Sequence, residues 1–218
     1  MIFKAEDLRE NKLLNVDNYE IPEVFRDDIE GVLVLEEHIK RRIERMAHDI
    51  HSKFSGMNPL VVPLLDGAAK FYGDLFTDRH YAFQIETEFL KVESGYEQGT
   101  ESTGVVKFPD PAQIERIMEK LSGNDRGILL VEDIVDTGRS VSLLREHLIE
   151  NGVESDRISL AALLNKPSRR LPEFEDLWID FLGFVIPDGF VVGYGMDFNK
   201  GYRNLGDLCV LKPKVYED

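Results

Sequence analysis

The residues best suited to chemistry lie in one short segment, 131–140, which reads Val-Glu-Asp-Ile-Val-Asp-Thr-Gly-Arg-Ser. The apolar run before it predicts a buried strand, and the residues after it predict a tight turn into a helix. Glu132 and Asp133 offer carboxylates that can accept hydrogen bonds from a ribose diol or help to hold a hydrated divalent cation. Open α/β sheets bind their ligands at such strand ends.

The turn after these acids suits a phosphate group. Asp136, Thr137 and Gly138 can leave backbone N–H groups free at the positive end of a helix dipole, and the hydroxyls of Thr137 and Ser140 can add to them. By itself the Asp-Thr-Gly triplet also fits an ordinary helix cap. It occurs in aspartic proteases too, but there the context is all-β, whereas a helix follows here and no second triplet exists. Three acids within five residues favour a binding site.

The elements that must position this segment follow two periodicities. Helices are predicted where apolar residues recur every three or four positions, as at Ile39, Ile43 and Ile50. Strands are predicted where short apolar runs stand between turn residues. The predicted helices cover residues 36–54, 68–76, 112–121 and 139–151. The predicted strands cover residues 60–65, 81–92, 127–131, 158–164, 178–185, 190–194 and 208–211.

Strands that alternate with helices predict an α/β fold, with a mainly parallel twisted sheet flanked by helices on both faces. The length of 218 residues fits one such domain. Residues 1–30 have no firm period, and we expect them to form an N-terminal arm that packs on the domain. Residues 94–104 are polar and rich in turn formers, so we expect a mobile loop there.

Composition narrows the class of partner and the compartment. The 41 acidic and 26 basic residues give a formal charge of −15, which repels nucleic acid and anionic lipid surfaces. No apolar run approaches membrane-spanning length, and the first residues lack the order of a signal peptide, so we expect a soluble cytoplasmic protein without nucleic-acid or membrane partners. The lone cysteine, Cys209, lies in an apolar run and is expected to be a buried thiol.

The segment 131–140 closely resembles the phosphoribosyl-pyrophosphate signature of type I phosphoribosyltransferases, in the form carried by hypoxanthine-guanine phosphoribosyltransferases. Four further segments are similar to that family in the same order: residues 65–71 to its pyrophosphate loop, 95–104 to its closing loop, 163–166 to the strand end that reads the purine, and 186–205 to its hood. The resemblance implies the type I fold with a small base-binding hood, over about 166–211 within a catalytic domain of residues 31–218.

On the phosphoribosyl side, the resemblance implies that Asp136 lies beside the purine N7 and acts as the general base. The residues implied to bind the ribose and its phosphate are Glu132, Asp133, Asp136, Thr137, Gly138, Arg139 and Ser140. The residues implied to bind the pyrophosphate are Asp66, Gly67, Ala68, Tyr96 and Arg203.

The pyrophosphate loop departs from the family pattern, because Asp66 stands where the family usually has a lysine. A carboxylate about 4 Å from a phosphate would be repelled by about 4 kcal/mol at an effective dielectric near 20. We therefore predict that Asp66 turns its side chain outward and that the loop binds phosphate through backbone N–H groups. The family can carry a cis peptide here, which would join Leu65 to Asp66.

On the purine side, Lys166 is implied to donate to the 6-oxo group, and Phe190 to stack on the base. The backbone of Val191 is implied to bond the edge of the purine, and Asp197 to lie in the purine site and orient a metal. The cofactor implied is Mg²⁺, and its implied ligands are Glu132, Asp133 and Asp197.

The expected substrates are therefore phosphoribosyl pyrophosphate and a 6-oxopurine, with hypoxanthine or guanine converted to IMP or GMP. The family also implies a homodimer or homotetramer. Two alternatives remain open at this point. One is a transferase that prefers xanthine. The other is a regulator that senses phosphoribosyl pyrophosphate and binds nucleic acid, although such a protein needs a basic face or an added domain.

Overall fold

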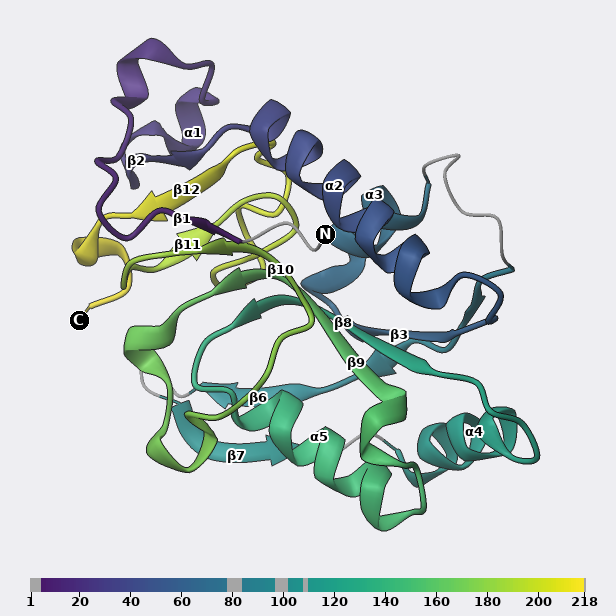
Figure 1. Cartoon of the computed structure of the whole chain (residues 1–218). Helices are drawn as coiled ribbons and strands as arrows, with labels where there is room; N and C mark the ends of the chain where they lie inside the picture. The colour runs from purple at the N-terminus through teal and green to yellow at the C-terminus, as the bar shows by residue number, and fades with distance from the viewer. Residues whose placement is uncertain (1–4, 78–83, 97–101, 108–109, 218) are drawn as a thin grey trace.

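The computed structural model describes the chain except for residues 1–4, 78–83, 97–101, 108–109 and 218, and it describes only the backbone of residues 93–96 and 102–107. Seven strands of the described chain form one sheet, in the order β1-β10-β9-β8-β3-β4 with β5 also on β3 (Figure 1). Every pair in this sheet is parallel. The predicted α/β fold with a mainly parallel sheet is thus confirmed.

The strands of this sheet are β1 (Glu6–Asp7), β3 (Leu60–Leu65), β4 (Glu86–Thr87), β5 (Leu90–Lys91), β8 (Ile128–Val135), β9 (Ile158–Asn165) and β10 (Phe181–Val185). The helices are α1 (Glu23–Arg26), α2 (Glu36–Phe54), α3 (Ala68–Phe76), α4 (Pro111–Leu121) and α5 (Arg139–Glu150). In Figure 1, α2 and α3 lie on one side of the sheet and α4 and α5 on the other.

Alternation along the strands builds two cores. On β8, Leu129 and Val131 face the core under α2 and α3, whereas Ile128 and Leu130 face the core under α4 and α5. Successive side chains of a strand point to opposite faces, so a continuous apolar run is what a sheet covered on both sides requires. This packing fixes β8, and with it the acids at its carboxyl end.

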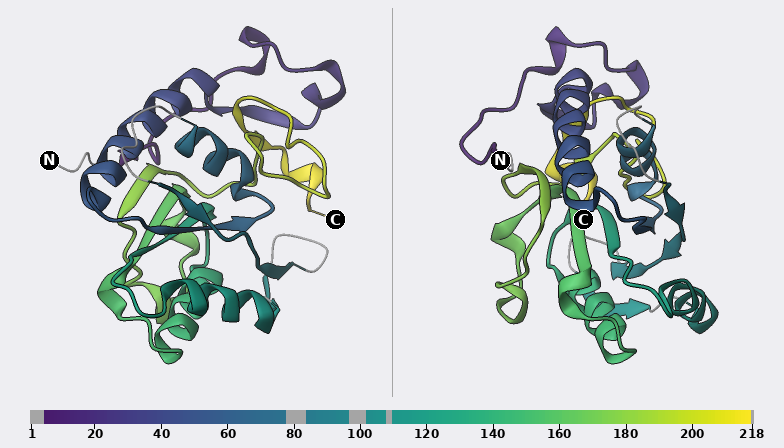
Figure 2. Two further views of the ribbon diagram at one scale, coloured as in Figure 1. Left: turned by 90° about the vertical axis from the view of Figure 1, so that its right-hand side faces the viewer. Right: turned by 45° about the vertical axis from the view of Figure 1, so that its right-hand side comes forward.

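A second, three-stranded sheet lies beside the first, in the order β11-β12-β2. Its strands are β11 (Val191–Val192), β12 (Leu208–Leu211) and β2 (Ile29–Val34), and all its pairs are antiparallel. The region expected to form the hood thus takes one strand from the N-terminal part of the chain. Figure 2 shows this yellow and purple region gathered at one end of the molecule.

The N-terminal residues contact both sheets. Strand β1 adds to the edge of the large sheet by pairing with β10. Further along, Leu14 bridges to Val32 of β2, and Ile21 is buried in the apolar cluster of the small sheet. Cys209 of β12 lies in the same cluster, where burial raises the pKa of its thiol to about 12.

Several expected elements differ in detail from those observed. Residues 94–104 were expected to form a loop, but β6 (Glu93–Tyr96) and β7 (Ser102–Lys107) pair there as antiparallel strands. The expected strand 81–92 is reduced to β4 and β5 over its described part. The expected strand 178–185 begins only at Phe181, and Trp178 before it is 78% exposed.

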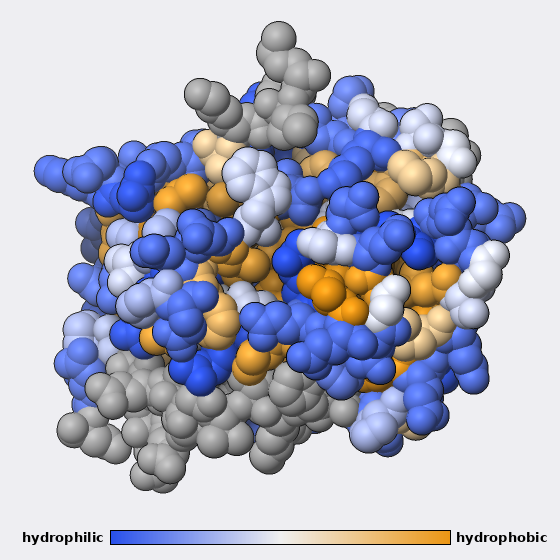
Figure 3. All heavy atoms as spheres, turned by 60° about the horizontal axis from the view of Figure 1, so that its bottom comes forward, coloured by the Kyte–Doolittle hydropathy of each residue, from blue (hydrophilic) through white to orange (hydrophobic). Residues whose placement is uncertain are grey.

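Figure 3, in which the lower side of Figure 1 comes forward, shows a largely hydrophilic face with apolar side chains in a hollow near its centre. Among the described residues, no helix combines the length and the apolar character that crossing a bilayer requires.

Candidate functional site

The segment singled out in the sequence spans the end of β8, a turn and the start of α5. The strand runs through the acids to Val135, so Glu132 and Asp133 project from β8 itself, and Asp136 and Thr137 follow it. Gly138 has a φ of 83°, in the left-handed region that favours glycine. The turn therefore needs glycine at this position, and its N–H groups stand at the first turn of α5, as an anion site requires.

The loop between β3 and α3 comes directly against this turn. A Cβ atom at Gly67 would overlap the carboxylate of Asp133, so only a residue without a side chain allows the present approach. The Leu65–Asp66 peptide is cis, as the resemblance to the family implied. Asp66 is exposed, and Ala68 begins α3. The two loops predicted to hold pyrophosphate and ribose phosphate are thus neighbours.

The acids of β8 lie in an environment that disfavours charge. Burial, together with the nearby carboxylate of Asp133, raises the pKa of Glu132 well above its usual value. Burial also raises the pKa of Asp133 to about 6, although the Ile134 N–H donates a 2.9 Å hydrogen bond to its Oδ1 and Arg203 opposes the shift. A divalent cation or a ribose diol would compensate these carboxylates.

The loop between β11 and β12 also comes close to the acids of β8 and to the loop between β3 and α3. Arg203 Nη2 lies 2.7 Å from Asp197 Oδ1, and the Lys200 N–H donates a 2.8 Å hydrogen bond to Asp197 Oδ2. A Cβ at Gly195 would stand 3.1 Å from the carbonyl oxygen of Gly67. Asp197 and Arg203 both act electrostatically on Asp133, so this loop brings them close to the acids of β8.

Lys166 follows β9 and is buried, with 6% of its surface exposed. Its ammonium donates a 2.8 Å hydrogen bond to the Gly189 carbonyl and stands 3.8 Å from Asp188. Burial lowers the pKa of Lys166, and the charges of Asp136 and Asp188 oppose that shift. The ammonium therefore lies between the turn after β8 and the residues just before β11.

Two arginines that the sequence analysis missed surround Asp136. Asp136 Oδ1 is buried without a hydrogen-bond donor among the described residues, and Arg169 Nε lies 3.6 Å from it. Arg170 packs over Gly138, and its Nη1 is likewise buried without a described acceptor. The only signal in the sequence was a pair of arginines soon after Lys166. The chain after Lys166 returns to the turn after β8, where the Leu171 N–H donates a 3.1 Å hydrogen bond to the Thr137 carbonyl. This path places the two arginines next to Asp136.

The remaining residues lie at the edges of this group. Val191 begins β11 and Phe190 directly precedes it, next to the residues that Lys166 contacts. Arg139 and Ser140 open α5. Tyr96 ends β6, but its side chain lies outside the described residues.

Among the described residues, no group of three or more histidine, cysteine or acidic side chains forms a ready cage for a metal ion. Two half-buried carboxylates with raised pKa values, Glu132 and Asp133, nevertheless lie close together, and Asp197 acts electrostatically on Asp133. Magnesium keeps several waters and binds through one or two carboxylates plus substrate phosphates. This donor set fits such an ion better than one that needs a closed protein cage.

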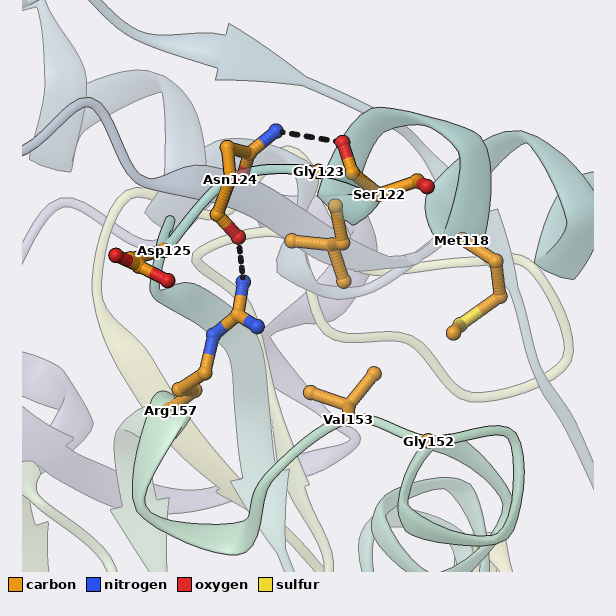
Figure 4. Close-up of a pocket in the computed structure, with 9 residues that line it drawn as sticks. Met118, Ser122, Gly123, Asn124, Asp125, Gly152, Val153 and Arg157 are labelled. Carbon is orange, nitrogen blue, oxygen red and sulfur yellow. Dashed lines mark hydrogen bonds between the residues drawn. The ribbon is translucent and has the colours of Figure 1, made fainter.

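A separate hollow of about 520 Å³ lies between the end of α4 and the loop before β9 (Figure 4). Its lining includes Met118, Val153 and Arg157, and the Arg157 guanidinium bonds backbone carbonyls of the loop before β8. It stands at the amino-terminal edge of β8 and β9, opposite the carboxyl ends at which such sheets bind ligands.

Comparison with known proteins agrees with this geometry. The model of the phosphoribosyl transferase domain family matches residues 34–199. The hypoxanthine-guanine phosphoribosyltransferase of Lactococcus lactis is 39% identical over 188 residues, which cover 86% of this chain and 94% of that protein. The bifunctional protein TilS/HprT of Listeria monocytogenes is 36% identical over 196 residues, 90% of this chain, but the chain spans only 28% of its length.

A solved structure of hypoxanthine phosphoribosyltransferase from Staphylococcus aureus superposes with a TM-score of 0.72 at 32% identity, and the match covers 91% of this chain and all of that one. The family model covers the large sheet except β1, the turn after β8 and the first part of the loop between β11 and β12. On both sequence and structure, the chain belongs to the phosphoribosyltransferase family, among the hypoxanthine-guanine phosphoribosyltransferases.

Proposed function

We propose that the protein transfers the 5-phosphoribosyl group of phosphoribosyl pyrophosphate to N9 of hypoxanthine or guanine. The N9–C1′ bond forms, the bond from C1′ to the pyrophosphate oxygen breaks, and the products are IMP or GMP and pyrophosphate. The observation that carries this proposal is the meeting of Asp136, Lys166 and the turn at Gly138 beside the carboxyl ends of the neighbouring strands β8 and β9. The L. lactis and S. aureus relatives bear names of the same reaction class.

Asp136 is assigned the proton transfer. The base must lose a proton as it attacks C1′, and a carboxylate within hydrogen-bond reach of N7 can accept it. Arg169 Nε lies 3.6 Å from Asp136 Oδ1, and Lys166 is close enough for the two side chains to interact electrostatically. No described residue donates a hydrogen bond to Asp136 Oδ1, so this oxygen is available for the role.

The phosphoribosyl group is assigned to the turn and to the acids before it. Glu132 and Asp133 hold the ribose hydroxyls, and the N–H groups of residues 137–140 hold the 5′-phosphate, helped by the hydroxyls of Thr137 and Ser140 and by Arg139. Backbone N–H groups of Asp66, Gly67 and Ala68, together with Arg203, hold the pyrophosphate. Tyr96 is proposed to reach it from the closing loop.

The purine is assigned to the hood. Lys166 donates to the 6-oxo oxygen, Phe190 stacks on the ring, and the backbone of Val191 bonds the edge of the base. Asp197 lies in the loop between β11 and β12 and helps to orient a magnesium ion with Glu132 and Asp133. Bound magnesium would neutralise charge on the departing pyrophosphate. We also propose a homodimer or homotetramer, which light scattering after size-exclusion chromatography would test.

The test is product formation with purified protein, hypoxanthine, phosphoribosyl pyrophosphate and MgCl₂. We expect IMP and pyrophosphate in equal amounts. EDTA should abolish the reaction, and MgCl₂ in excess should restore it. Release of pyrophosphate without IMP would indicate hydrolysis and would contradict the proposed transfer.

A further inference from the structure

The last residues described in the chain lie against the residue proposed to stack on the purine. Tyr216 follows a short 3₁₀ turn, Pro213–Val215, and its ring centroid is 5.2 Å from that of Phe190, with the ring planes 30° apart. Phe198 meets the same phenylalanine edge-on, at 5.1 Å and 80°. Phe190 therefore has two aromatic neighbours that restrict its rotation.

The segment that carries Tyr216 is fixed in place. The Lys212 N–H donates a 2.8 Å hydrogen bond to the Asp28 carbonyl, and Lys212 Nζ donates a 2.9 Å bond to the Asp27 carbonyl. One residue earlier, the Leu211 N–H donates to the Phe190 carbonyl at 2.9 Å. Hydrogen bonds to the N-terminal residues and to Phe190 itself therefore hold the C-terminal segment in place.

The chemistry of the phenol also fits a packing role. Burial raises the pKa of Tyr216, and the carboxylates of Glu217, Glu30 and Asp188 act in the same direction. The ring thus stays neutral near neutral pH. A neutral aromatic ring can stack on one face of a phenyl ring while a base stacks on the other face.

We propose that Tyr216 is a positioning residue for the purine, which backs the face of Phe190 opposite the base and holds that ring in its stacking orientation. The inference rests on the proposed function, because it takes Phe190 as the residue that stacks on the substrate. A partly exposed phenylalanine without this support would have to be ordered when the base binds, and that ordering weakens binding.

The test compares Tyr216→Ala, Tyr216→Phe and Tyr216→Leu with wild type in steady-state kinetics. Loss of the ring should raise the KM for hypoxanthine by about 3- to 10-fold, the scale of one aromatic pair. The KM for phosphoribosyl pyrophosphate and kcat should stay within about twofold, because no role in the phosphate sites is assigned to Tyr216. The KM for hypoxanthine of Tyr216→Phe should match that of wild type. The KM of Tyr216→Leu should lie between those of wild type and Tyr216→Ala.

Tyr19→Ala is the matched control, because Tyr19 packs against the same apolar cluster as Tyr216. An equal rise in the purine KM for Tyr19→Ala would show a general loosening of the hood and would overturn the inference. A lower purine KM in Tyr216→Ala would do so too, since it would mean that Tyr216 itself occupies the base site. An unchanged KM in an active enzyme would refute the inference alone, whereas an inactive wild type would refute the proposed function as well.

Discussion

At the scale of single residues, the proposed proton transfer rests on Asp136. We predict that Asp136→Asn lowers kcat by about 10²-fold, because an amide cannot accept the purine proton. Binding of phosphoribosyl pyrophosphate, measured by calorimetry with Mg²⁺, should persist, since the backbone of the turn remains. The control is Asp176→Asn, which changes an exposed acid between β9 and β10. Turnover within threefold of wild type would remove Asp136 from the mechanism.

Lys166 is predicted to read the base and not the sugar. Lys166→Gln should raise the KM for hypoxanthine more than that for phosphoribosyl pyrophosphate, because the buried ammonium faces Gly189 of the hood. Lys12→Gln, at an exposed lysine of the N-terminal residues, should change neither constant. If only the constant for phosphoribosyl pyrophosphate rises, the assignment of Lys166 to the purine is wrong.

At the scale of elements, the loop between β3 and α3 offers a matched pair of substitutions. Asp66→Ala should change kcat/KM for phosphoribosyl pyrophosphate by less than about tenfold, because the exposed side chain is removed while the backbone donors remain. Gly67→Ala should lower it by about 10²-fold, the scale of a misplacement near 1 Å, since its Cβ would displace the Asp133 carboxylate.

The outcome for Asp66→Ala decides how this loop holds the pyrophosphate. A loss beyond about 10²-fold would mean that the Asp66 carboxylate itself holds a metal ion or another group, and the backbone account would fail. The thermal melt of Asp66→Ala should stay close to that of wild type, because the side chain removed is exposed.

The elements differ in how far the sequence could predict them. The helix 36–54 and the strand 60–65 were predicted with the bounds observed, because their apolar periodicity is local and strong. Strand β2 was not predicted. It pairs with β12, and the paired residues are 174 to 182 positions apart along the chain, so no local pattern can indicate such a partner.

The residues of the site also differ in how far the sequence could predict them. The acids of β8 and the turn at Gly138 were identifiable because their whole chemistry lies in ten consecutive residues. Arg169 and Arg170 were missed, since their closeness to Asp136 depends on the path of the chain after Lys166. The contact of Tyr216 with Phe190 was equally invisible, because it joins the C-terminal segment to β11 through packing alone.

At the scale of the whole molecule, the acids of the site should make stability depend on pH. The pKa of Asp133 rises from its usual 3.8 to about 6 in the folded protein, so between these values the folded state holds a proton that the unfolded chain has lost. Stability therefore falls as pH rises from about 4 to about 6, by at most about 1.4 kcal/mol per pH unit for this group. Burial of Glu132 acts in the same direction.

We predict that Asp133→Asn flattens this dependence. Urea unfolding in EDTA at pH 4.5, 5.5 and 6.5 would give the difference in unfolding free energy between the variant and wild type. The titration of distant carboxyls contributes equally to both proteins and therefore cancels in this difference. The variant should gain stability over wild type as pH rises through this window. A constant difference across the three pH values would show that Asp133 titrates at its usual pKa in the folded protein.

The measurement that tests the central claim most directly is a set of initial rates with five bases at saturating phosphoribosyl pyrophosphate and Mg²⁺. Lys166 presents a donor, which suits an oxo group at C6 and opposes an amine. We predict the highest kcat/KM for hypoxanthine or guanine and a lower value for xanthine. For adenine and uracil, kcat/KM should be lower than for the preferred base by at least about 10³-fold. Adenine or uracil as the preferred substrate would contradict the claim that this site is built for a 6-oxopurine.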